Sequence, residues 1–213
     1  MKRLSIAALL VGVAVASAAV TASSSAAPSS TRAAQLALAR AATAKYANDL
    51  GRARADGYGI LTRMIPNMGY HYLNPSVKTF DLRKPPILVY EHRGAKWQLG
   101  ALEWVFAKRP AKAPIAGAQY GTFGAACHYR DGTFVFASSA DKCAASSPVV
   151  HRVACGAAPV DQQSACDRTI RAKGAKLNFW HGPLVTMHVW LWYPNPDGLF
   201  AGMNPLVSPF NEG

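Results

Sequence analysis

The fold of this chain is decided by a stretch near its end, WHGPLVTMHVWLWYPNP at residues 180–196. From Leu184 onward, β-branched and aromatic residues predict a strand, because such side chains suit a pleated, half-buried surface. Alternation along a strand places Thr186 and His188 on one face and Met187 and Val189 on the other. Apolar residues fall on both faces, so we expect a central strand that is covered on both sides. A histidine in such a strand needs a polar partner or a functional role, because burying an unpaired polar group is costly.

The N-terminal region has the features of a secretory signal peptide. Lys2 and Arg3 form a short basic segment, and a run rich in Ala, Val and Leu follows over residues 4–20. We therefore expect residues 1–27 to be a signal peptide with a Ser/Ala-rich tail, and residues 28–213 to form a single mature domain. The protein would then be secreted or otherwise extracytoplasmic. An uncleaved membrane anchor is the alternative, because the apolar run is close to spanning length.

The charge balance is strongly basic, with 23 Lys and Arg against 11 Asp and Glu and a formal net charge of +12. The basic residues are scattered, and they do not interleave with aromatic residues in one stripe. We therefore do not expect nucleic acid as a partner. An anionic cell-envelope polymer would suit the charge better, although charge speaks mainly to solubility and non-specific association.

The cysteine pattern predicts disulfide bonds. The chain has four cysteines, at positions 127, 143, 155 and 166. An even number in an exported chain favours two disulfides, and the spacing does not match paired CxxC zinc ligands. Of the three pairings, we favour Cys127–Cys143 and Cys155–Cys166, because each closes a short local loop. Three of the four cysteines fall in a polar segment, residues 138–176, which we expect to form a disulfide-stapled excursion at the surface.

Patterns along the rest of the chain predict one helix and several strands. Apolar residues at spacings of three and four predict a helix over residues 31–56, and Pro and Gly predict a loop-rich segment over residues 60–86. Alternating apolar runs around Gly-containing turns predict two hairpins, formed by 87–92 with 96–107 and by 125–130 with 133–137. We therefore expect an α+β domain, with an N-terminal helix packed on a mainly antiparallel β-sheet or small barrel and a disulfide-stapled loop excursion.

Four polar side chains are expected to lie inside this fold: His71, Glu103, His181 and His188. Glu103 is surrounded by apolar residues, so its carboxyl group must be paired, bind a cation or be neutral. Imidazoles together with a carboxylate suit zinc, copper, iron or manganese. We predict a divalent transition-metal site at His71, Glu103 and His188, with His181 as a further candidate. Separate hydrogen bonds within the core are the alternative.

Three segments resemble a family of uncharacterised exported bacterial proteins. NMGYHYLNP at 67–75 is similar to their "GMGYHY-N" loop, and LEW at 102–104 is similar to a "VEY"-like strand. HVWLW at 188–192 and NPDGLF at 195–200 are similar to their C-terminal "HVWLW–NP-G-F–NP" segment. This chain has Asn67 where the family has Gly, and Leu-Glu-Trp in place of Val-Glu-Tyr. The motif positions correspond to His71, Glu103 and His188, with His181 as a further candidate, so the resemblance implies the location of the site and not its chemistry.

The functional hypothesis is a secreted binding protein with a His/Glu site for a divalent transition metal or a small ligand. Tyr70 or Tyr72 is expected to orient a ligand or the metal-binding side chains. One alternative is a metal-dependent enzyme that uses the same site, which requires an open coordination position. The other is an envelope- or carbohydrate-binding module without metal, which requires exposed Trp side chains and histidines that lie far apart.

Overall fold

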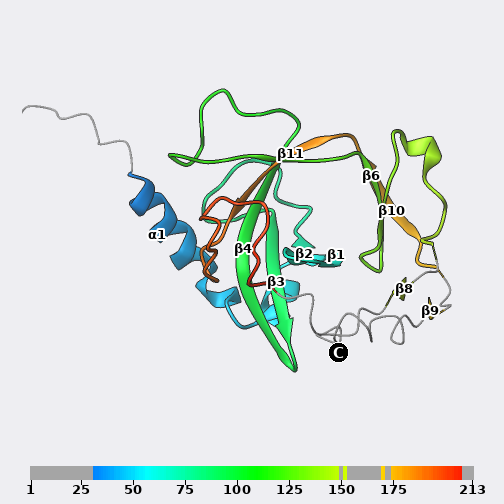
Figure 1. Cartoon of the computed structure of the whole chain (residues 1–213), viewed down its shortest axis with the longest axis horizontal. Helices are drawn as coiled ribbons and strands as arrows, with labels where there is room; N and C mark the ends of the chain where they lie inside the picture. The colour runs from blue at the N-terminus through cyan, green and yellow to red at the C-terminus, as the bar shows by residue number, and fades with distance from the viewer. Residues whose placement is uncertain (1–30, 149–150, 153–168, 171–173, 208–213) are drawn as a thin grey trace, which may run out of the picture.

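The computed structural model describes residues 31–148, 151–152, 169–170 and 174–207, and Figure 1 shows their arrangement. Helices pack against a curled antiparallel sheet that forms a half-barrel, so the predicted α+β fold is confirmed. The expected signal peptide, residues 1–27, and the expected Cys155–Cys166 disulfide lie outside the described residues. Within the described part, no helix is both long and apolar enough to cross a membrane.

The N-terminal helical segment is interrupted. It consists of α1 (Arg32–Thr43), a short 3-10 helix (Ala44–Tyr46) and α2 (Leu50–Ala55). The hydroxyl of Thr31 accepts a hydrogen bond from the backbone N–H of Ala34 and caps α1. Asp49 accepts one from the N–H of Arg52 at 2.7 Å and starts α2 in the same way. The prediction of a single helix over residues 31–56 was therefore wrong about its continuity, because the Asp49 carboxylate begins a new helix inside it.

The main sheet has six antiparallel strands in the order β1-β2-β3-β4-β11-β5. Their bounds are β1 Gly59–Ile65, β2 Gly69–Leu73, β3 Ile87–Arg93, β4 Lys96–Phe106, β5 Gly121–Phe123 and β11 Leu184–Val189. The predicted hairpin of β3 and β4 is confirmed. β11 lies between β4 and β5, which confirms that the stretch from Leu184 is an internal strand covered on both faces.

The first part of the segment predicted as loop-rich is a hairpin of β1 and β2. Its Pro and Gly residues build the turn between the strands and do not mark a long loop. Asn67 has a φ of 62° and Gly69 has a φ of 109°, a conformation that side chains disfavour. A Cβ at Gly69 would also lie 2.4 Å from the carbonyl oxygen of Tyr90. The turn thus sets the position at which β2, with its Tyr-His-Tyr triplet, pairs with β3.

A smaller sheet lies beside the main one (Figure 1). It has the order β10-β6-β7, and its strands are β6 Ala126–Tyr129, β7 Phe134–Phe136 and β10 Leu177–His181. The predicted hairpin of β6 and β7 and the predicted Cys127–Cys143 disulfide are both confirmed. Three further short segments lie between β7 and β10 in the chain: a 3-10 helix (Ala140–Lys142) and a pair of strands, β8 His151–Arg152 and β9 Thr169–Ile170.

The two sheets are joined at the turn between β6 and β7. The backbone N–H of Arg63 on β1 donates to the carbonyl oxygen of Gly132 at 2.9 Å. The Nε of Arg63 donates to the carbonyl oxygen of Asp131 at 2.8 Å, and its guanidinium also pairs with the Asp131 carboxylate. These contacts fix the small sheet over β1.

The main sheet has two different faces. One packs on the helices and carries the larger hydrophobic cluster, which includes Leu88, Leu102, Trp104, Met187 and Val189. The other carries a smaller cluster, which consists of Ile87, Val89, Ala101, Trp190 and Val207. Strand alternation separates the two sets. Three of the four polar side chains predicted to lie inside the fold, His71, Glu103 and His188, are on the second face. The fourth, His181, is on β10 of the small sheet.

Candidate metal centre

Three of the predicted residues converge on the second face of the main sheet. His71 comes from β2, Glu103 from β4 and His188 from β11. His188 is paired directly with Glu103 in the antiparallel register. His71 is paired with Val89 on β3 and extends across that strand towards Glu103. Alternation explains the arrangement, because the neighbours of each residue along its strand turn to the helix side.

The distances within this cluster are those of a candidate metal site. Nε2 of His71 lies 3.7 Å from one carboxylate oxygen of Glu103, and Nε2 of His188 lies 3.6 Å from the other. One ligand atom from each residue fits within 4.8 Å of the other two. The two nitrogen–oxygen distances are longer than a hydrogen bond. Nε2 of His188 is buried, and it has no hydrogen-bond partner in the described part of the chain.

Burial decides the protonation states of the cluster. All three side chains are 6 % exposed or less. Burial raises the pKa of Glu103 to about 8, because the apolar surroundings penalise the carboxylate. Burial also lowers the pKa of His71 to about 3 and that of His188 to about 4, and the nearby His188 lowers the first further. At neutral pH without an ion, the two imidazoles are therefore neutral and the carboxyl group holds its proton.

A hydroxyl group orients His71. Oγ1 of Thr62, its partner across β1 and β2, lies 2.8 Å from Nδ1. A protonated Nδ1 donates to this oxygen, and the lone pair of Nε2 then points towards Glu103. Metal-binding histidines usually donate their other ring N–H in this way, which fixes the tautomer. Nothing in the local sequence marks Thr62, because its role depends on the pairing of β1 with β2.

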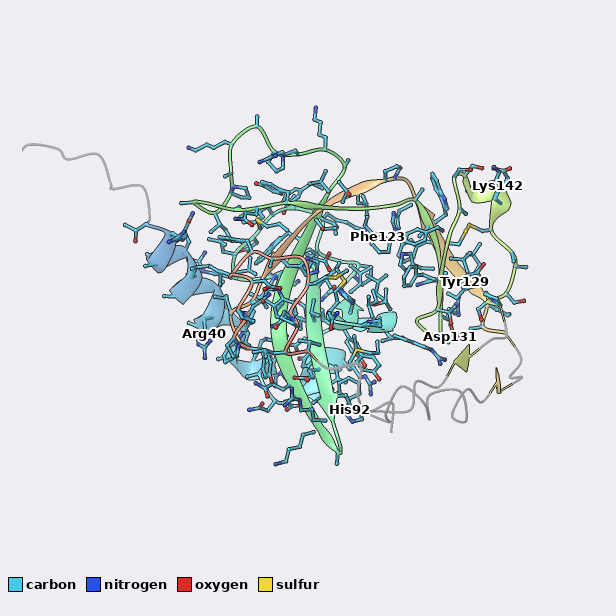
Figure 2. All side chains as sticks on the ribbon, viewed as in Figure 1. Arg40, His92, Phe123, Tyr129, Asp131 and Lys142 are labelled. Atoms are coloured by element: carbon cyan, nitrogen blue, oxygen red, sulfur yellow. A yellow bond between two sulfur atoms is a disulfide. The ribbon has the colours of Figure 1, made fainter. Side chains whose placement is uncertain are left out.

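The cluster opens onto a cavity of about 140 Å³ between the main sheet and the small sheet. Apolar side chains make up most of its wall, among them Leu61, Ile65, Met68, Phe123 and Leu184. Phe123 is the last residue of β5 in the main sheet, and Figure 2 shows it on the side of that sheet nearest β6 and β10. Three protein ligands beside a cavity leave room for a water molecule or a small ligand at the remaining positions of an ion.

The fourth predicted ligand, His181, lies in the same cavity but outside this group of three. It is at the end of β10, and its Nε2 lies 3.0 Å from Nε2 of His128 on β6. His128 was not predicted as a site residue. A signal was present, because His128 stands in a strand pattern between the apolar neighbours Cys127 and Tyr129, as Glu103 does between Leu102 and Trp104.

The tyrosines that were expected to orient a ligand lie on the helix side of the main sheet. The ring centroids of Tyr70 and Tyr72 are 5.0 Å and 6.1 Å from that of Trp97, within the larger hydrophobic cluster. Successive residues of β2 point to opposite faces, so these rings are directed away from the face that carries His71. Thr62 instead makes an orienting contact with His71.

The Trp side chains do not form an exposed platform. Trp104 and Trp190 are buried, and Trp97, Trp180 and Trp192 are half-buried. The indole N–H groups of Trp180, Trp190 and Trp192 donate to groups within the protein. A carbohydrate-binding surface made of these rings therefore has no support in this arrangement.

Comparison of the chain with known protein families, with curated proteins and with solved structures finds no match.

Proposed function

We propose that this protein binds a divalent first-row transition-metal ion through His71, Glu103 and His188, and that it does so outside the cytoplasm. The observation that carries the proposal is the unpaired Nε2 of His188, buried beside a carboxyl group and a second imidazole. A buried nitrogen without a hydrogen-bond partner is unfavourable, and so is a charged carboxylate in apolar surroundings. A single cation bound by all three side chains removes both penalties.

The donor set supports a transition metal over magnesium or calcium. Two imidazoles and one carboxylate suit zinc, copper, iron or manganese, whereas the alkaline-earth ions prefer sites made of oxygen ligands. Metal–ligand distances of about 2.0–2.2 Å place two ligands of a tetrahedral ion roughly 3.3–3.6 Å apart. The nitrogen–oxygen separations of 3.6 Å and 3.7 Å need to shorten by only a few tenths of an ångström.

Export is supported by the sequence of residues 1–27 and by the Cys127–Cys143 disulfide, since disulfides persist mainly in oxidising compartments. The resemblance to exported bacterial proteins at residues 67–75, 102–104 and 188–200 points the same way. In this proposal the mature domain, residues 28–213, carries the metal site.

Elemental analysis of untagged protein tests the ligand assignment. Wild-type protein should carry metal, and the variants His188→Ala and Glu103→Ala should each lose one equivalent. His92→Ala is the matched control, because the ring of His92 is stacked on Trp97 on the helix side of the sheet. It should keep the wild-type metal content. Unchanged metal content in both cluster variants would overturn the assignment.

A second candidate function is catalysis by the bound ion. It is supported by the cavity beside a site with only three protein ligands, which leaves a coordination position for water or substrate. Protein loaded with Co²⁺ should show a change in its visible absorption when azide is added, because azide would enter the open position. A spectrum that azide does not alter would show a closed site and would remove this candidate.

A further inference from the structure

A second pair of imidazoles lies in the same cavity, on the side of the small sheet. His128 and His181 come from the neighbouring strands β6 and β10, and their Nε2 atoms are 3.0 Å apart. His128 is 2 % exposed. Aromatic rings surround the pair, with centroids 5.1 Å (Phe179) and 5.8 Å (Phe134) from that of His128, and 5.7 Å (Phe123) from that of His181. The two nitrogens thus face each other in an apolar enclosure.

The protons of this pair cannot satisfy every contact. Nδ1 of His181 lies 2.6 Å from the carbonyl oxygen of Gly182, and a carbonyl oxygen only accepts, so this nitrogen carries the proton. The Nε2 of His181 therefore presents a lone pair. Nδ1 of His128 faces another carbonyl oxygen, that of Leu61, at 3.3 Å. If Nδ1 of His128 donates to that oxygen, the Nε2 lone pairs of His128 and His181 face each other at 3.0 Å. If Nε2 of His128 carries the proton instead, the lone pair on its Nδ1 faces the carbonyl oxygen of Leu61.

A cation between the two Nε2 atoms resolves the conflict. Both Nδ1–H groups can then donate to carbonyl oxygens, which is the usual arrangement of metal-binding histidines. Two imidazoles on one tetrahedral ion have nitrogens roughly 3.3 Å apart, and the pair needs to open by only a few tenths of an ångström from 3.0 Å. We propose that His128 and His181 bind a second transition-metal ion in this cavity.

The chemistry of the pair indicates which ion it would take. Two neutral imidazoles without a carboxylate suit zinc or copper. The remaining coordination positions face the same apolar cavity as the first cluster. The two sites are also linked through β1, because Leu61 contacts His128 while the next residue, Thr62, contacts His71. A small molecule in the cavity would therefore be exposed to both metal positions.

The competing explanation is a proton shared by the two nitrogens, which a separation of 3.0 Å also accommodates. An additional proton on His128 would place a positive charge on a ring that is 2 % exposed and lies against Phe134 and Phe179, and burial disfavours the charged form. A doubly coordinated ion also has its charge inside the cavity, but it gains water or ligand atoms at its open positions. The two explanations differ in metal stoichiometry, which can be measured directly.

The experiment is a stoichiometric titration of metal-free, full-chain protein with zinc under non-reducing conditions. Wild-type protein should bind two equivalents, and His181→Ala should bind one. His181 is half-buried at the end of its strand, so this variant is the safer one to fold; His128→Phe, which fits the aromatic surroundings, provides an independent check and should also bind one.

Glu103→Gln separates this proposal from the proposed function. If Glu103→Gln also retains one equivalent and the variant Glu103→Gln/His181→Ala retains none, both sites are established. One equivalent in wild-type protein that Glu103→Gln loses and His181→Ala keeps would overturn the second site and leave the first. The reverse pattern would overturn the first site and leave the second.

Discussion

His188 on β11 lies directly opposite Glu103 on β4, with its Nε2 atom 3.6 Å from a carboxylate oxygen. The separation is too long for a hydrogen bond and close to the distance between two ligands of one ion. Both groups are buried, and the pKa shifts show that each is held in its neutral form. A metal ion can insert between a neutral imidazole nitrogen and an acidic group of this kind with loss of one proton.

The first prediction concerns the stability of the metal-free protein. The pKa of Glu103 is raised from 4.5 to about 8 on folding, so its contribution to stability is fully present below pH 4.5 and is lost as the pH rises towards 8. Glu103→Gln has no proton to lose. We therefore expect the unfolding free energy of this variant to rise relative to that of wild-type protein by roughly 2–4 kcal/mol as the pH increases from about 5 to about 8.5. Each pKa unit corresponds to about 1.4 kcal/mol.

Urea unfolding with a chelator present measures this difference. Glu91→Gln is the matched control, because Glu91 is equally buried but is paired with Arg93 at 2.7 Å. It should show no comparable gain at alkaline pH. If the unfolding free energies of wild-type protein and Glu103→Gln changed with pH in parallel, the assigned protonation state of Glu103 would be contradicted.

The second prediction is the pH dependence of metal affinity. Below pH 8 an ion must displace the proton of Glu103, whereas His71 and His188 are already neutral above about pH 4. We expect the affinity for zinc to rise about tenfold per pH unit between about pH 5.5 and 7.5 and to level off above pH 8. Calorimetry in buffers of different ionisation enthalpy should report the release of about one proton per ion at this site. An affinity that is flat across the acidic range would show that Glu103 is already ionised.

The third prediction concerns the hydroxyl group behind His71. Thr62→Val keeps the size and the strand preference of the side chain but removes the acceptor 2.8 Å from Nδ1. Loss of such an orienting partner typically weakens metal binding 10- to 100-fold, and we expect that range here. Thr122→Val is the control, because Thr122 also lines the cavity but is exposed on β5. Equal effects of the two substitutions would show that polarity of the cavity, and not the orientation of His71, sets the affinity.

Part of this site could be predicted from sequence because its ligands conflict with their surroundings. Glu103 stands among apolar residues of a long strand, and His188 stands in a β-branched and aromatic run. Local alternation then places each of them on a covered face. The α+β class followed from the same patterns, and the Cys127–Cys143 disulfide followed from the short loop that it closes.

The remainder depends on pairing between distant strands. His128 and His181 are 53 residues apart and meet because β6 pairs with β10, which no local pattern reveals. The role of Thr62 cannot be predicted locally, because the Pro and Gly residues that follow it predict a loop and not the β1–β2 hairpin. The break at Asp49 was missed because a carboxylate that caps a helix has the same spacing as one on its solvent face.

The fourth prediction concerns the disulfide. Cys127–Cys143 closes a loop with a sequence separation of 16 residues. A loop of that length contributes roughly 3 kcal/mol through the entropy of the unfolded chain. We expect the double variant Cys127→Ala/Cys143→Ala to lose about 2–3 kcal/mol of unfolding free energy. Because the disulfide anchors β6, the metal affinity of the His128–His181 pair should fall. The ion at His71, Glu103 and His188 on the main sheet should be kept. Loss of that first ion in a variant that still folds would contradict the separation of the two sites.

The fifth prediction concerns the turn that positions His71. Gly69 has a φ of 109°, and an added Cβ would lie 2.4 Å from the carbonyl oxygen of Tyr90. Gly69→Ala must therefore strain the turn or push β2 away from β3, and His71, two residues further on, would move with it. We expect a loss of at least about 2 kcal/mol in unfolding free energy and a lower metal affinity.

Gly59→Ala is the matched control in β1, because nothing lies within 4 Å of its added Cβ. It should change the unfolding free energy by no more than about 0.5 kcal/mol. Denaturant unfolding and zinc titration of both variants decide the matter, and equal behaviour of the two would mean that the turn does not hold His71 in place.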